Sequence, residues 1–157
     1  MLRDFVQGKT VLSSLKTNWG VRHALALSAI LVVLLAEFVY MSRAPELVDE
    51  GANWKQIVIF LNRELSLKPG LNVIPGYHAL IAAALMAFQK SGIYSARFLT
   101  TWISFASVIV FYLLTWKVYS RPSLMKTFQY AFFPLFFPFF SLIYTDILAM
   151  MLVLLAF

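Results

Sequence analysis

Apolar residues in this chain gather in long runs that are separated by short polar stretches. The four runs cover residues 23–41, 98–116, 127–143 and 147–157. Because a helix needs about 20 consecutive apolar residues to cross a bilayer, the first three runs predict membrane-spanning helices. Pro134 and Pro138 remove backbone donors from the third run, so we expect a kink there. The last run reaches the end of the given sequence after 11 residues. We therefore expect a truncated span and an amino-terminal part of a longer protein.

A polar stretch, 43–73, follows the first run and predicts a sizeable extramembrane loop. Within it, Asp49 is placed to begin a helix. The apolar residues that recur at helical spacing behind it are Trp54, Ile57, Val58, Leu61 and Leu65. We expect this helix to lie along the membrane surface.

A fifth apolar stretch, 73–89, opens with Pro75-Gly76 and has 17 residues. A helix of that length spans about 25 Å at 1.5 Å per residue, less than the hydrocarbon core of about 30 Å. The distribution of Lys and Arg bears on the same question, with 4 cations in residues 1–22, 3 in residues 117–126 and 6 in the 55 residues of 43–97. Both dense segments are cytoplasmic only if 73–89 does not cross. We therefore interpret 73–89 as a helix that dips into the membrane.

Composition agrees with this class and excludes several others. The 157 residues are 61% hydrophobic and 13% charged, with a mean hydropathy of +0.79, which is too apolar for a soluble domain. The net charge of +6 comes from cations that flank the runs rather than form a patch for nucleic acid, so we expect no nucleic-acid partner. Cys is absent, and no spacing typical of metal ligands occurs, so we assign no metal residues. The predicted fold is an all-α, multi-pass integral membrane domain.

Carboxylates near the membrane surface are the candidates for chemistry. Asp49 and Glu50 follow the first run, and Asp146 stands between two long apolar runs, where a carboxylate is costly unless it is paired, hydrated or used. Arg97 at the start of a span is the favoured cation for a phosphate. Each has a plain structural alternative: the acids as helix caps or first-turn charges, and Arg97 as an interfacial anchor.

These residues fit one reaction class. When an activated sugar arrives on a lipid phosphate, the leaving group is already good. Inverting transfer then needs mainly one carboxylate to take the acceptor hydroxyl's proton and cations to steady the departing phosphate. With this topology, Asp49, Glu50 and Asp146 share the non-cytoplasmic side, where they can build one site.

The order of short motifs resembles a known family of membrane enzymes. The motifs are Asp49-Glu50, Pro75-Gly76, Arg97-Phe98 and the Pro134-containing aromatic run that ends in Tyr144-Thr145-Asp146. In this order and spacing, over about residues 40 to 157, they resemble the GT-C membrane glycosyltransferases, in particular the dolichyl-phosphate-glucose dependent α-1,2-glucosyltransferase family. The chain differs from that family in having Gly51, Ala52 and Asn53 after the acidic pair and Ser66 to Gly70 in place of a Trp-Asp-Pro stretch.

The resemblance implies a multi-pass enzyme that moves a hexose, with glucose favoured, from a polyprenyl-phosphate or dolichyl-phosphate donor to a lipid-linked glycan acceptor. It implies a catalytic Asp at Asp49 with Glu50 beside it and a second acidic position at Asp146. We expect Asp49 to be the general base, with Glu50 and Asp146 orienting the acceptor or the base. We expect Arg97, Tyr144 and Thr145 to contact substrate. The donor is a co-substrate, and no cofactor is assigned.

The expected location is the endoplasmic reticulum membrane in a eukaryote, or the inner or plasma membrane in a prokaryote. The rival interpretation is a non-catalytic multi-pass membrane protein, either a transporter fragment or an assembly subunit. In that case the carboxylates serve as caps or ion contacts.

Overall fold

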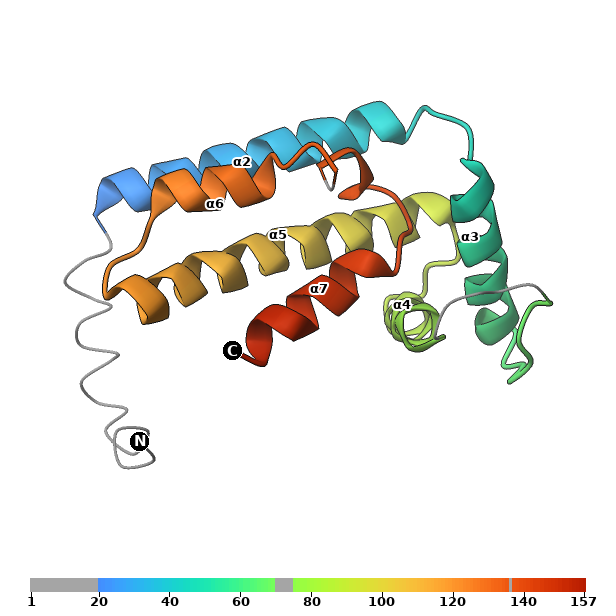
Figure 1. Ribbon diagram of the computed structural model, residues 1–157. Helices are drawn as coiled ribbons and strands as arrows, with labels where there is room; N and C mark the ends of the chain where they lie inside the picture. Colours follow the sequence, from blue (N-terminus) through green and yellow to red (C-terminus); the bar gives the residue numbers. More distant parts are fainter. Residues whose placement is uncertain (1–19, 70–74, 136) are drawn as a thin grey trace.

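The computed structural model describes residues 20–69, 75–135 and 137–157, and this part of the chain is helical without a strand. The elements, in chain order, are α2 (Val21–Met41), α3 (Val48–Leu61), α4 (Gly76–Ala87), α5 (Ile93–Tyr119), α6 (Leu124–Ala131), the short 3₁₀ helix η2 (Phe137–Phe139) and α7 (Asp146–Leu155). Figure 1 shows α2, α5 and α6 side by side, with α3 and α4 at one end of this layer. The amino-terminal cations Arg3, Lys9 and Lys16 lie outside the described residues.

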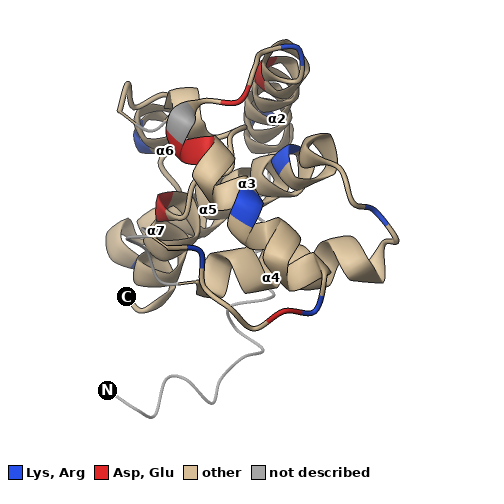
Figure 2. Ribbon diagram, turned by 90° about the vertical axis from the view of Figure 1, so that its right-hand side faces the viewer, with Lys and Arg blue, Asp and Glu red and all other residues tan. Residues whose placement is uncertain are grey.

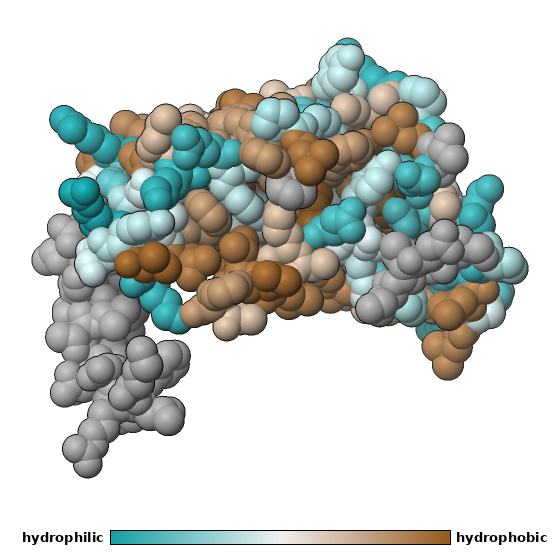
Figure 3. Space-filling model, viewed as in Figure 1, coloured by the Kyte–Doolittle hydropathy of each residue, from teal (hydrophilic) through white to brown (hydrophobic). Residues whose placement is uncertain are grey.

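Two of these helices are long and apolar enough to cross a membrane. They are α2, with 21 residues, and α5, with 27 residues. At 1.5 Å per residue they extend about 32 and 40 Å, against a hydrocarbon core of about 30 Å. They run antiparallel, so the end of α2 and the start of α5 lie together (Figure 1). Hydrophilic residues gather toward both ends of the molecule and apolar residues cover much of the middle (Figure 3).

The shared core of α2 and α5 contains residues from four helical elements and the segment before α7. Its buried members are Leu27, Ile30, Leu34, Val108, Tyr112, Ala131, Phe140 and Ile147. Phe140 belongs to the irregular segment between η2 and α7, and its side chain is buried in this core. Because α2 buries only one stripe here, its opposite face, with Leu25 and Val32 both 64% exposed, is left apolar and open, as expected of a helix that faces lipid.

α3 and α4 form a separate layer at the end of the two long helices. Figures 1 and 2 show α4 running across the direction of α5 rather than alongside it. Ile57 of α3 and Ile81 of α4 are buried against each other's helix and against Ala96 at the start of α5. The apolar faces of α3 and α4 therefore hold this layer on the end of α5. Of the segment that was expected to dip into the membrane, residues 73 and 74 lie outside the described residues.

α3 is the helix that the sequence predicts near Asp49, but it is shorter at its carboxyl end. Leu65 was expected on its apolar face, yet the helix ends at Leu61 and Leu65 is 94% exposed. Arg63 takes a left-handed conformation with φ of 63°, and the Glu64 amide donates to the Ile59 carbonyl. A left-handed residue with this backbone bond is a common way of closing a helix.

The aromatic run 127–143 differs from the expected kinked span. α6 ends at Ala131, and apart from η2 the described residues between it and α7 have irregular backbone. Pro134 and Pro138 lack the amide hydrogen that a helix requires, and each disfavours helical backbone in the residue before it. The two prolines therefore break the helix rather than kink it.

Hydroxyl groups buried on α5 hold this irregular segment and the α4 layer. The Ser104 Oγ lies 2.7 Å from the Phe140 carbonyl oxygen and 2.9 Å from the Thr100 carbonyl oxygen, so one proton serves two acceptors. The Thr100 Oγ1 is 2.6 Å from the Tyr77 hydroxyl of α4. Non-helical backbone at membrane depth is tolerated only where other groups satisfy it, and Ser104 does so here.

Candidate functional site

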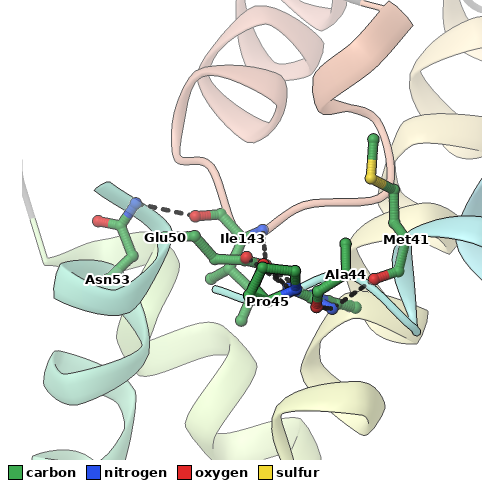
Figure 4. Close-up of polar contacts among 7 residues, drawn as sticks. Met41, Ala44, Pro45, Glu50, Asn53 and Ile143 are labelled. Atoms are coloured by element: carbon green, nitrogen blue, oxygen red, sulfur yellow. Dashed lines mark hydrogen bonds and ion pairs between the residues drawn. The ribbon is translucent and has the colours of Figure 1, made fainter. Parts of the chain in front are cut away.

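A buried ion pair joins α3 to the start of α5. Both oxygens of Glu50 accept from Arg97, with Nε–Oε1 at 2.8 Å and Nη2–Oε2 at 2.6 Å. The side chains are 0% and 1% exposed. Three backbone carbonyls take the remaining donors of Arg97, those of Met41 at 2.6 Å, Ala44 at 3.3 Å and Pro45 at 3.5 Å (Figure 4). A guanidinium has five N–H donors, so each donor has an acceptor within the protein.

Arg97 also donates a hydrogen bond to the carbonyl at the carboxyl end of α2. Met41 is the last residue of α2, and carbonyl groups at a helix end have no partner within the helix. The turn at Ala44 and Pro45 carries two more such carbonyls. A single buried cation thus joins α2, the following turn and α3, while its carboxylate partner keeps the charge compensated.

Glu50 and Asn53 together hold the backbone of Ile143, the residue that leads into α7. The Ile143 amide donates to Glu50 Oε1 at 3.3 Å, and Asn53 Nδ2 donates to the Ile143 carbonyl at 2.8 Å. Because the two side chains are three residues apart, they lie on one face of α3. Asn53 Oδ1 is 3.0 Å from Nε2 of His78 on α4. We call Glu50, Arg97, Asn53, His78 and Ile143 the Ile143 clamp.

His78 is a structural member of this clamp. It is fully buried, and its Nδ1 makes no hydrogen bond of ordinary geometry. Burial lowers the pKa of His78 below its usual 6.5, and a weak contact with the Pro75 backbone opposes this only in part. The neutral ring is therefore the form that suits the site, and it donates to Asn53 in the tautomer with hydrogen on Nε2.

The structure separates the three predicted catalytic carboxylates into two kinds. Glu50 is buried and bonded on both oxygens, whereas Asp49 and Asp146 are exposed. Neither α3 nor α7 has a side-chain cap, so the expectation of a capping hydrogen bond is not met. All three acids instead stand in first turns, where the helix dipole favours negative charge. Figure 2 shows the acidic first turns of α3 and α7 on the same side of the molecule.

Arg97 lies where a phosphate cannot reach it without dismantling the clamp. Its side chain is 1% exposed and its donors are committed, which agrees with a structural anchor rather than the expected phosphate contact. The physical reason is that a buried cation at a helix start takes the nearest carboxylate and orphan carbonyls.

The Tyr144 hydroxyl is affected by the charges of the acidic residues. Burial raises the pKa of the Tyr144 hydroxyl, and the negative charges of Asp49, Glu50 and Asp146 raise it further. The hydroxyl therefore stays protonated and is a donor. Tyr144 and Asp146 also line one small pocket.

Two pockets flank Asp146. A smaller pocket of about 270 Å³ is lined by Leu135, Phe139, Tyr144, Asp146 and Ile147. A larger one of about 640 Å³ lies between α4 and α7, with Tyr77, Leu80 and Leu152 on its walls and Thr145 and Asp146 at its polar end. The first is just below and the second within the size of typical ligand sites, about 300–1,000 Å³.

Several contributors were not predicted from the sequence. Asn53 holds Ile143, and Phe139 lies against Tyr144 with ring centroids 4.9 Å apart and planes at 59°. Asn53 is three residues after Glu50, and this spacing could have placed it on the same face of α3. No local spacing relates Phe139 to Tyr144. Among the residues that the structure describes, no three His, Asp or Glu side chains gather as a metal site.

No family model matches this chain, and no curated protein or solved structure matches it either. The described part of the chain is all-helical, and two of its helices are long and apolar enough to span a membrane.

Proposed function

We propose that the chain belongs to a multi-pass membrane glycosyltransferase of GT-C type. It moves a hexose from a polyprenyl-phosphate or dolichyl-phosphate donor to a lipid-linked glycan acceptor on the non-cytoplasmic side. The observation that carries the proposal is the position of Asp146. This exposed carboxylate stands between an aromatic pocket and a long apolar pocket at one end of the helices.

The aromatic pocket suits a sugar ring. Phe139 and Tyr144 offer flat apolar faces, while the Tyr144 hydroxyl and the Asp146 carboxylate offer a donor and an acceptor for sugar hydroxyls. The larger pocket suits a lipid chain, because Leu80, Leu148 and Leu152 line it and its polar groups are at one end. A lipid-linked sugar has the same division between an apolar tail and a polar head.

In this proposal Asp146 is the general base and Asp49 the second carboxylate. Asp146 takes the proton of the acceptor hydroxyl. The oxygen of that hydroxyl attacks the anomeric carbon from the face opposite the leaving group. The bond to the lipid phosphate breaks, the configuration inverts, and the phosphate leaves with the electron pair. Glu50 and Arg97 are positioning residues, since they fix Ile143, which is three residues before Asp146.

The test measures transfer of labelled hexose from a polyprenyl-phosphate donor to a lipid-linked acceptor in vesicles that contain the full-length protein. A general base contributes about 10²–10⁴ in rate, so Asp146→Asn should lower transfer by at least about 100-fold. Glu64→Gln is the matched control, because Glu64 is an exposed acid in the loop after α3 and lines neither pocket.

The comparison with Asp49→Asn assigns the base. If Asp49→Asn abolishes transfer while Asp146→Asn does not, Asp49 holds the role that the resemblance implies, and our assignment is overturned. If wild-type protein transfers no hexose from glucose, mannose or galactose donors, the non-catalytic membrane subunit takes the place of the enzyme.

A further inference from the structure

A second apolar groove lies at the opposite end of the molecule, where α5 ends and α6 begins. Its volume is about 510 Å³, and its walls include Phe111, Leu114 and Val118 of α5 and Tyr130 of α6. Phe111 and Tyr130 stack with ring centroids 4.4 Å apart and planes at 5°, which makes a flat apolar floor. This groove shares no lining residue with either pocket beside Asp146.

One cation lines this groove, and two more lie close to it in the chain. Lys126 lines it, and its Nζ lies 3.8 Å from the ring centroid of Tyr119, which holds the ammonium at the mouth. Lys117 in the last turn of α5 and Arg121 in the turn before α6 are exposed nearby in the chain. Figure 1 shows this junction at the end of the molecule remote from α3 and α4.

Lys117 donates to the oxygen of Phe157, whereas neither Lys126 nor Arg121 pairs with a carboxylate side chain among the described residues. The six acidic residues of the described ranges all belong to the other end, from the last turns of α2 through the loop after α3 to the start of α7: Glu37, Glu46, Asp49, Glu50, Glu64 and Asp146. The single ion pair found among the described side chains is that of Arg97 with Glu50. The charge of Lys126 is therefore available to an external anion.

We propose that this groove binds one anionic glycerophospholipid. An acyl chain lies along Phe111, Leu114 and Val118, and the lipid phosphate contacts Lys126 at the mouth. The positive-inside rule places this end at the cytoplasmic leaflet, where anionic lipids are enriched. A neutral lipid would leave Lys126 without a counter-charge, and a soluble anion would leave the apolar floor uncovered, so the two halves of the groove together select a charged lipid.

The test uses the purified full chain in mild detergent, with bound lipid counted by native mass spectrometry at equal concentrations of phosphatidylglycerol and phosphatidylcholine. One cation near a lipid phosphate corresponds to about a fivefold change in affinity. We expect Lys126→Gln to weaken phosphatidylglycerol binding about fivefold and to leave phosphatidylcholine binding unchanged. Arg22→Gln is the matched control, because Arg22 is a cation near the start of α2 at the same end and does not line the groove.

A second pair of variants tests the apolar part. Val118 is 61% exposed and lines the groove, so Val118→Trp fills the groove without disturbing the core. Leu113, 41% exposed on the same helix, lies outside the groove and gives the control Leu113→Trp. We expect Val118→Trp alone to reduce lipid binding. The proposal is overturned if Lys126→Gln binds phosphatidylglycerol as wild type does, if Arg22→Gln weakens it equally, or if Val118→Trp has no effect.

Discussion

Glu50 and Asp146 are both acidic residues in the first turn of a helix at the same end of the molecule, yet their surroundings are opposite. Glu50 is fully buried, bonded to Arg97 by both oxygens and to the Ile143 amide. Asp146 is exposed at the edge of two pockets. Burial and its hydrogen bonds make Glu50 a structural carboxylate, whereas Asp146 remains accessible at the pockets. Substitutions at the two positions should therefore differ in their effects on stability.

Arg97→Met should have the largest effect on stability. It leaves the Glu50 carboxylate buried without its cation and removes the Arg97 hydrogen bonds from three carbonyls, of which that of Met41 still accepts from the Ala44 amide. Breaking a buried pair in this way costs about 3–5 kcal/mol. Reversible unfolding of the protein in mixed micelles measures the loss. The double variant Arg97→Met with Glu50→Leu removes the stranded charge and should recover much of it; equal losses in both variants would contradict the ion-pair explanation.

Asn53→Ala should have the next largest effect. It removes the donor to the Ile143 carbonyl and the acceptor for His78, and it leaves both of those groups buried. An unsatisfied buried polar group costs about 1–3 kcal/mol. The same unfolding assay measures this loss, with Asn62→Ala as the control, because Asn62 is exposed at the end of the same helix. A loss no larger than that of the control would show that the clamp does not depend on Asn53.

His78 should make stability depend on pH in a defined direction. Its pKa is lower in the folded protein than the usual 6.5, so the unfolded chain binds the proton more readily. Stability is therefore full above pH 6.5 and falls as the pH drops through that value toward the lower pKa of the folded state. Melting temperatures between pH 7.5 and 5 measure this. His78→Gln should flatten that part of the profile, and an unchanged slope in the variant would assign it to another group.

Asp146→Asn should have the smallest effect on stability and the largest on transfer. Its side chain is exposed and makes no ion pair, and exposed substitutions of this kind usually change stability by less than about 0.5 kcal/mol. The unfolding assay and the hexose-transfer assay are run on the same preparation. A destabilisation comparable to that of Asn53→Ala would make Asp146 a second structural carboxylate and would remove the contrast with Glu50.

The helical class of the fold could be predicted from the sequence. Uninterrupted apolar runs predicted the helices that became α2 and α5, because length and hydropathy are local properties of the chain. Asp49 was correctly predicted near a helix start, and the first turn of α7 is the structural alternative that was considered for Asp146. Pro134 and Pro138 marked an interruption, although the structure breaks the helix at Ala131 where a kink was expected.

The contacts of the polar residues depend on the tertiary structure. Glu50 and Arg97 are separated by 47 positions, and Asn53 and Ile143 by 90, so no local spacing relates them. Their contacts depend on α3 packing across the end of α5 and on the prolines that return the chain to that point. Burial then fixes the roles, since a buried charge needs a partner and an exposed one does not. The same sequence pattern therefore gave a structural carboxylate at Glu50 and an accessible one at Asp146.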